Sequence, residues 1–191
     1  AKDIFSQYTL LIGDILNFMD TIGRQGRMLQ DSDAANSYLI NSLLHTIPNQ
    51  VEALGKLRGK GAGILSSNNL TLENKLQIAA LADSKNAVAL SKDIEYLFNE
   101  APALSSALSN TYQKTKQQLS DYLALANTEI IKTETATMNA NKFFDQGSQT
   151  ISSLLALFDR MQLALDERMN NQIAKAKANI TFYITLIIVV L

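Results

Sequence analysis

The chain has 191 residues and a formal net charge of -1, so it is long enough for one domain with a sizeable core. It contains no cysteine, which excludes a disulfide scaffold, a thiol enzyme and a cysteine zinc site. The 17 basic and 18 acidic residues are interspersed, so there is no basic patch for a phosphate backbone, and we expect no nucleic-acid partner.

Apolar residues in the N-terminal segment recur in alternating steps of four and three, the spacing of a packed helical seam. These positions are Ile4, Tyr8, Leu11, Ile15, Phe18 and Ile22. They predict a first helix that ends near Leu29. Because the chain begins inside this amphipathic pattern, we expect further sequence upstream.

The next segments are also helical by their spacing. Asp31-Ser32-Asp33 supplies N-cap side chains for a second helix, in which Pro48 should cause a kink or a restart. Thr71 should open a third helix, and the same spacing recurs over residues 108–130 and 151–165. No segment shows strand-like alternation. We therefore predict an all-α protein, an elongated antiparallel bundle of the four-helix type with long helices.

The C-terminal segment differs from the rest of the chain in charge. No charged residue follows Lys177, and residues 180–191 read ITFYITLIIVVL. Twelve apolar residues are fewer than the roughly 20 that cross a membrane, but lysines followed by aromatic residues are typical of a helix that enters the headgroup region. We therefore predict a helical domain over residues 1–178 and the start of a transmembrane helix over residues 179–191. A buried C-terminal helix or strand is the alternative.

Five helical passes pose a problem of parity, because a domain whose two ends meet one membrane face needs an even number. We expect the interruption at Asn99–Pro102 to be a kink and not a reversal, since Pro102 suits the first turn of a continuing helix. The alternative is a short sixth helix near residues 136–144, with Asp145-Gln146-Gly147 as its turn.

Arg58 occupies a seam position of the second helix, where leucine or isoleucine would be expected. A guanidinium in a core needs an anion, so either a carboxylate of the bundle or a bound anionic ligand should face it. Asp83, on a seam position of the third helix, is the internal candidate.

Four glycines between residues 55 and 63 fit no phosphate-loop motif. Close helix contact, or a backbone opened beside a ligand, would explain them.

Arg24 and Arg27 form a second basic point near the end of the first helix, where the helix C-terminus itself favours cations. Tyr38 lies too far along the second helix to reach the arginine site, so it is a candidate for a separate polar contact near the turn that opens this helix. The one histidine, His45, cannot build a multi-histidine metal site, and the serines lack a nucleophile elbow. We expect no enzyme, metal or cofactor.

Two segments carry a resemblance to a known family. They are DSDAANSYLINSLLHTIPNQVEALGKLRGKGAGIL, which begins at Asp31, and FFDQGSQTISSLLALFDRMQLALDERMNNQIAKAK, which precedes the apolar terminus. With that terminus they resemble the helical-bundle extracytoplasmic sensor domains of bacterial chemoreceptors. Related sensor domains occur on membrane histidine kinases. The resemblance implies a homodimer at the inner membrane that faces the periplasm, receives a small molecule or a periplasmic binding protein, and signals by small helix displacements.

The hypothesis from the sequence is therefore the sensor domain of a transmembrane chemotaxis receptor. The candidate ligand-binding residues are Arg58, Arg24, Arg27, Tyr38 and Asp83. The alternatives are the sensor domain of a membrane histidine kinase, a helical pore-forming or membrane-assembly protein, and a dimerising helical stalk without a ligand.

Overall fold

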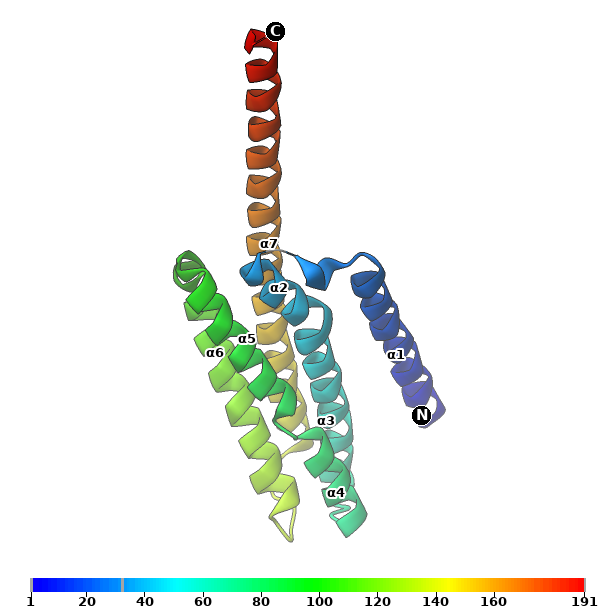
Figure 1. Cartoon of the computed structure of the whole chain (residues 1–191). Helices are drawn as coiled ribbons and strands as arrows, with labels where there is room; N and C mark the ends of the chain where they lie inside the picture. The colour runs from blue at the N-terminus through cyan, green and yellow to red at the C-terminus, as the bar shows by residue number, and fades with distance from the viewer. Residues whose placement is uncertain (1, 32, 191) are drawn as a thin grey trace.

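The computed structural model describes residues 2–31 and 33–190, and all regular structure in this part of the chain is helical (Figure 1). The α-helices are α1 (Lys2–Gln25), α2 (Ala34–Asn41), α3 (Ile47–Ser67), α4 (Leu72–Leu81), α5 (Lys85–Glu100), α6 (Pro102–Ala126) and α7 (Ala140–Val190). The shorter segments are a 3-10 helix, η1 (Met28–Gln30), and two π-helical turns, η2 (Ser42–Thr46) and η3 (Asn127–Ile131). The prediction of an all-α protein is confirmed.

The segments α2, η2 and α3 follow one another without a loop. Asp33 caps α2 as predicted, because its carboxylate accepts hydrogen bonds from the amides of Ala35 and Asn36 at 3.0 and 3.3 Å. Pro48 lies in the first turn of α3, directly after η2, where a missing amide hydrogen costs little. The chain thus stays helical from α2 into α3, and the irregularity expected at Pro48, a kink or a restart, takes the form of the π-helical turn η2.

The core lies among α3, α5, α6 and α7, which stand side by side in Figure 1. α7 packs against both α3 and α6, and α5 packs against α2 and α6. Fully buried core side chains include Leu54, Leu57, Ile94, Leu97, Leu108, Phe143, Leu154 and Leu157. Each large apolar side chain buried in this way contributes about 1.5–3 kcal/mol to stability.

The interruption at Asn99–Pro102 is a reversal, so the prediction of a kink there is wrong. α5 rises and α6 descends in Figure 1, and Phe98 before the break packs edge-on against Tyr112 after it, with ring centroids 6.4 Å apart. Ala101, between the helices, has φ -137° and ψ 75°. A residue before proline is driven out of the helical region, which explains why the chain breaks and turns here.

The interruption between α4 and α5, at residues 82–84, is the one across which the chain continues in the same general direction (Figure 1). The predicted third helix is therefore two helices. The alternative turn at Asp145-Gln146-Gly147 is also wrong, because these residues lie inside α7.

α1 is attached to the other helices mainly near its C-terminal end (Figure 1). There Gly23 adjoins Leu44, and His45 Nδ1 lies 3.7 Å from the carboxylate of Asp20. The predicted seam of α1 faces away from the bundle. The side chains of this α1 seam, each 46–65% exposed, are those of Ile4, Tyr8, Leu11, Ile15, Phe18 and Ile22. The expectation that this seam is packed is therefore wrong within the described chain.

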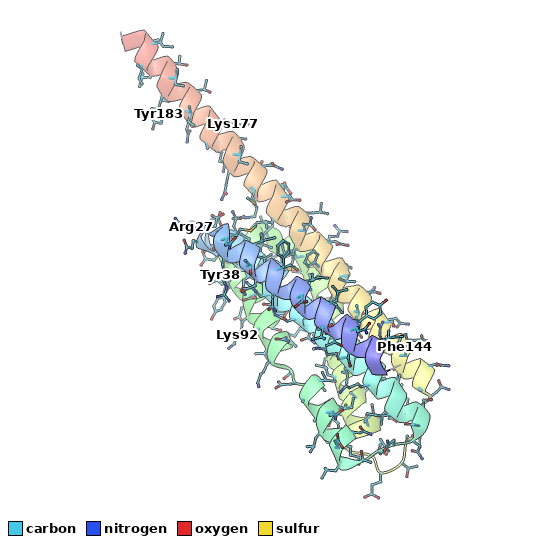
Figure 2. All side chains as sticks on the ribbon, turned by 90° about the vertical axis from the view of Figure 1, so that its right-hand side faces the viewer. Arg27, Tyr38, Lys92, Phe144, Lys177 and Tyr183 are labelled. Carbon is cyan, nitrogen blue, oxygen red and sulfur yellow. The ribbon has the colours of Figure 1, made fainter. Side chains whose placement is uncertain are left out.

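α7 extends well beyond the other helices. It spans 51 residues, and every side chain from Met169 to Val189 is exposed. Figure 2 shows Lys177 and Tyr183 on this projecting part. None of the described helices is both long enough and apolar enough to cross a membrane.

Candidate functional site

Arg58 is half-buried between α3 and α7, and it forms no ion pair with any described residue. Its Nη1 donates a hydrogen bond to Ser148 Oγ at 2.9 Å, and its Cζ lies 4.5 Å from the centroid of the Phe144 ring. Its Nε is buried without a hydrogen-bond partner. Of the two alternatives for Arg58, the internal pair with Asp83 does not form. Asp83 is exposed and pairs with Lys85 Nζ at 3.1 Å, because the helix that would have aimed it inward is interrupted there.

The structure does not bring the other predicted residues to Arg58. Arg24 is exposed and pairs with Asp20 at 2.7 Å, one turn earlier on α1. Arg27 lies beyond the end of α1 in the left-handed region, with φ 50°, so the first helix ends four residues before the predicted Leu29. Tyr38 stacks on Tyr96 of α5, with ring centroids 5.4 Å apart.

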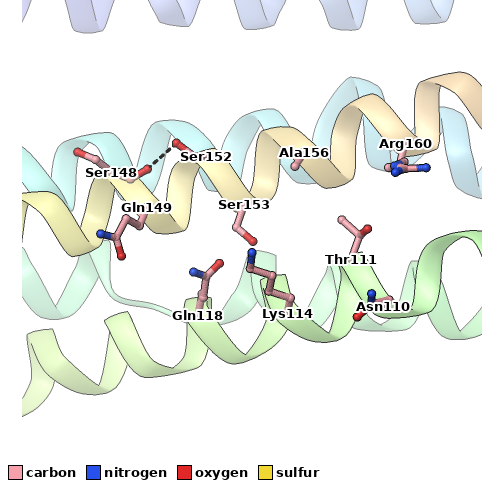
Figure 3. A pocket seen from close by; sticks show the side chains of 10 residues that line it. All are labelled: Asn110, Thr111, Lys114, Gln118, Ser148, Gln149, Ser152, Ser153, Ala156 and Arg160. Atoms are coloured by element: carbon pink, nitrogen blue, oxygen red, sulfur yellow. Dashed lines mark hydrogen bonds between the residues drawn. The ribbon is translucent and has the colours of Figure 1, made fainter.

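A polar groove of about 690 Å³ runs between α6 and α7 (Figure 3). The residues that line this α6–α7 groove are Asn110, Thr111, Lys114, Gln118, Ser148, Gln149, Ser152, Ser153, Ala156 and Arg160. None of these lining residues is acidic, and neither Lys114 nor Arg160 forms an ion pair with any described residue. Figure 3 shows Lys114 pointing across the groove toward Ser153. The groove therefore presents two cations together with hydroxyl and amide groups.

Helical spacing places these side chains together. Lys114 and Gln118 lie one turn apart on α6, as Ser148 and Ser152 do on α7, and residues four apart share a helix face. The two helices are joined beside the groove by Thr115, whose hydroxyl donates to the backbone carbonyl of Ser153 at 3.0 Å. Ammonium and guanidinium groups form strong hydrogen bonds with anions, and hydroxyls can donate or accept. This lining suits a small anion.

A second pocket, of about 370 Å³, adjoins one end of the groove. Gln118 and Gln149 line both, and the second pocket, here called the Tyr122 pocket, also includes Tyr122, Asp121, Leu125, Gln146 and Thr150. The Tyr122 hydroxyl and the side-chain carbonyl oxygens of Gln118 and Gln146 are buried without hydrogen-bond partners. Burial raises the pKa of Tyr122 far above its ordinary value, although the positive charge of Arg58 acts in the opposite direction.

The sequence-based prediction missed Lys114, Arg160 and the serines of α7. A signal was present, because polar residues recur at helical spacing beside the apolar seams of both helices, with no acidic residue among them. Only the knowledge that α6 and α7 are neighbours turns these two separate stripes into one groove. Comparison of the chain with protein-family models, with curated proteins and with solved structures finds no match.

Proposed function

We propose that this chain is the periplasmic sensor domain of a transmembrane chemotaxis receptor, built as an antiparallel four-helix bundle that binds a small anion in the α6–α7 groove. The observation that carries the proposal is the continuity of α7. One uninterrupted helix lines the groove with Ser148 and Arg160 and then projects from the bundle to an exposed apolar tip at residues 180–189. A ligand held between α6 and α7 would act directly on the helix that leaves the bundle.

Binding shifts such a domain only if the ligand prefers one arrangement of the two helices. Lys114 on α6 and Arg160 on α7 both line the groove, so an anion bound there interacts with groups of both helices and favours the arrangement of α6 and α7 that brings them nearer to it. In this proposal the residues of the groove only bind the anion. The domain therefore acts as a receptor and carries out no reaction. The apolar tip of α7 would continue into the inner membrane.

The α1 seam supports a homodimer in this proposal. A large apolar or aromatic residue has a full accessible area on the order of 200 Å². At exposures of 46–65%, the six seam residues therefore offer roughly 650 Å² per copy. Stable interfaces bury about 600–1,000 Å² on each partner, and steps of four and three are those of a coiled coil. A second copy of α1 is the partner that this spacing matches.

The absence of cysteine from the sequence makes a direct test practical. Single cysteines at exposed Asn49 on α3 and Gln162 on α7 would carry spin labels outside the groove, and a label pair within α3 is the control. Sulfate and succinate are suitable anionic probes. We expect either probe to raise the melting temperature and to move the α3–α7 distance by about 1–2 Å, the scale of helix shifts in signalling proteins.

Removing both cations by Lys114→Ala and Arg160→Ala should abolish both responses while the protein stays folded. An unchanged melting temperature and distance with every small anion would contradict the proposal. Leakage of dye from vesicles on addition of the chain would instead favour the membrane-assembly alternative, which the exposed apolar tip of α7 also suits.

A further inference from the structure

A pocket of about 400 Å³ lies between α5 and α6, which stand side by side in Figure 1, and is here called the α5–α6 pocket. Its inner wall belongs to the core, because Leu90, Tyr112, Thr115 and Leu119 are each at most 7% exposed. The other residues that line it are Ser84, Ala87, Val88, Ser91, Lys92, Glu95, Lys116, Ser120 and Leu123. Buried, mainly apolar side chains thus form the inner wall, and all three charged residues of the lining are exposed.

The inner wall of this pocket has no polar atom that needs a partner. The Thr115 hydroxyl is already hydrogen-bonded to the backbone carbonyl of Ser153, at 3.0 Å, and no buried or half-buried lining residue has a buried side-chain polar atom without a hydrogen-bond partner. Apolar cavities hold water poorly and take up hydrocarbon groups. The volume lies within the range of small-molecule sites, roughly 300–1,000 Å³. The interior therefore suits a compact hydrocarbon group such as a phenyl ring.

Two lysines and one glutamate lie at the mouth of the pocket. α5 and α6 run in opposite directions, and Phe98 packs against Tyr112, so these two residues mark one level of the helix pair. At a rise of about 1.5 Å per residue, Lys92, Glu95 and Lys116 lie roughly 9, 4.5 and 6 Å from that level, all in the same direction. The three charged residues therefore lie within about one helical turn of one another along the bundle.

The protein leaves a net positive charge at this mouth. Lys92, Glu95 and Lys116 form no ion pair with any described residue. Lys116 Nζ lies 5.9 Å from the centroid of the Tyr112 ring, so this ammonium group is beside the inner wall itself. Two ammonium groups exceed one carboxylate by a single charge. An anionic group on a ligand whose hydrocarbon part fills the pocket would meet this excess.

The α5–α6 pocket and the α6–α7 groove lie on opposite sides of α6. Lys114 and Lys116 are two residues apart, which is about 200° around a helix, so their side chains point in nearly opposite directions. Lys114 lines the groove, and Lys116 lines the α5–α6 pocket. The two spaces share no lining residue.

We propose that the α5–α6 pocket binds a small apolar monocarboxylate, with the hydrocarbon part against Tyr112 and Leu119 and the carboxylate near Lys92 and Lys116. This site is separate from the α6–α7 groove and does not depend on the anion proposed to bind there.

Calorimetric titration of the full chain with three related probes tests the proposal. 3-Phenylpropionate has both the ring and the carboxylate, propionate has only the carboxylate, and 3-phenylpropanol has only the ring. We expect propionate to bind at least about ten-fold more weakly than 3-phenylpropionate, because the ring holds most of the apolar area to be buried. The alcohol should bind about three- to ten-fold more weakly at low ionic strength, and this difference should shrink as salt is added.

Variants of the charged residues locate the carboxylate. Lys116→Ala should lower the affinity for 3-phenylpropionate several-fold and leave that for 3-phenylpropanol unchanged. Glu95→Gln should raise the affinity for 3-phenylpropionate, because it removes a negative charge from the mouth. Lys114→Ala, the same change on the opposite face of α6, is the matched comparison. All three residues are exposed, so these variants should stay folded.

A variant of the wall locates the ring. Ser91 is half-buried and lines the pocket, so Ser91→Leu should occupy part of it and lower the affinity for both ring-bearing probes at least about five-fold. Ser106→Leu places the same side chain at an exposed position of α6 outside the pockets described and is the matched control. Thermal unfolding of both variants checks that they are folded.

Three results would overturn the proposal. Binding of the ring-bearing probes that a folded Ser91→Leu leaves unchanged would place them on another surface, such as the exposed α1 seam or the tip of α7. A larger loss of affinity in Lys114→Ala than in Lys116→Ala would place the carboxylate in the α6–α7 groove. Equal affinities of the acid and the alcohol, or no binding of the acid at millimolar concentration, would contradict a site for an apolar monocarboxylate.

Discussion

Gly61 sets how closely α3 and α7 approach. A Cβ at this position would overlap the ring of Phe143, with Phe143 Cζ at 2.8 Å and Ile130 Cδ1 at 3.2 Å. Phe143 is fully buried, so its ring has no solvent to move into. Close helix contact therefore explains this glycine of the cluster, whereas an added Cβ at Gly55 or Gly63 would meet nothing within 4 Å.

Two alanine substitutions in this cluster should therefore change the free energy of unfolding in opposite directions. Gly61→Ala should destabilise the protein by about 1–3 kcal/mol, the usual cost of overpacking a core. Gly63→Ala should stabilise it by about 0.5–1 kcal/mol, because alanine is the better helix former and the space is open. Urea unfolding of the two variants measures both free energies. A stabilising Gly61→Ala would show that α3 and α7 pack less closely at this level.

Arg58 makes neutral contacts in place of the expected ion pair. Arg58→Ala removes a hydrogen bond to Ser148 and the contact with the Phe144 ring, and should cost about 1–2 kcal/mol. A stranded buried carboxylate would have cost about 3–5 kcal/mol. Urea unfolding distinguishes the two ranges. Arg58→Lys, which keeps the charge without the planar guanidinium, should lie between the unmodified chain and the alanine variant.

The start of α2 and the last packed turn of α7 are joined by a polar network. Arg168 Nη2 donates to both carboxylate oxygens of Asp33, at 2.8 and 2.7 Å, and Arg168 Nε donates to Asn36 Oδ1 at 2.8 Å. Gln172 also donates to Asp33, at 3.2 Å. Asp33 thus caps one helix and holds another, at the level where α7 leaves the bundle.

This network should make the free energy of unfolding depend on pH in the acidic range. Burial acts to raise the pKa of Asp33, but hydrogen bonds from Arg168 and from the amides of Asn36 and Ala35 outweigh it, so the pKa lies below the ordinary value of 3.8. A carboxyl with a lowered folded pKa stabilises the protein fully above its unfolded pKa, and that stability is lost as pH falls through the folded pKa.

Asp33→Asn keeps a capping side chain but removes the charge. The variant should therefore melt below the unmodified chain at pH 7, and the two melting temperatures should converge as pH falls from about 4 toward 2. Thermal unfolding at several pH values is the measurement. A constant difference down to pH 2 would mean that the charge of Asp33 contributes nothing.

Local signals in the sequence predicted the ends of several helices, because caps act within a few residues. Asp33 and Thr71 each accept a hydrogen bond from the first turn of the helix that follows, and Pro48 lies directly after a π-helical turn. Which break reverses the chain was not predictable in this way. The choice depends on contacts such as that of Phe98 with Tyr112, between residues whose pairing exists only once the helices are packed. The neighbours of Arg58 and the α6–α7 groove could not be predicted from the sequence for the same reason.

At the scale of the whole molecule, α1 presents different faces to the bundle and to solvent. Half-buried or buried residues of α1 are Thr9, Gly13, Leu16, Met19, Asp20 and Gly23, whereas the more apolar α1 seam is exposed. The side of α1 that contacts the chain's own bundle thus combines Leu16 and Met19 with small and polar residues. The apolar side is left for a partner, as the proposed homodimer requires.

A charge on the α1 seam should disrupt that dimer. Phe18→Asp should weaken self-association of the chain at least ten-fold, because it places a carboxylate within an apolar interface, at the most exposed side chain of the seam. Asn17→Asp, exposed and off the seam, is the matched control and should leave association unchanged. Sedimentation equilibrium gives the association constants. A monomeric unmodified chain at all concentrations, with no cross-linking between copies of α1 in a membrane, would contradict the dimer.

The length of α7 gives it the mechanics of a lever. The helix rises about 1.5 Å per residue, so Arg168 lies roughly 22 Å from Ser153 in the groove and roughly 32 Å from Val189 at the tip. Arg168 is anchored to Asp33 and Asn36, which makes it the natural fulcrum. For a straight rod turning about that fulcrum, a movement of about 1 Å at Ser153 becomes about 1.4 Å at the tip, in the opposite direction. Binding that draws α7 toward α6 would thus swing the apolar tip the other way.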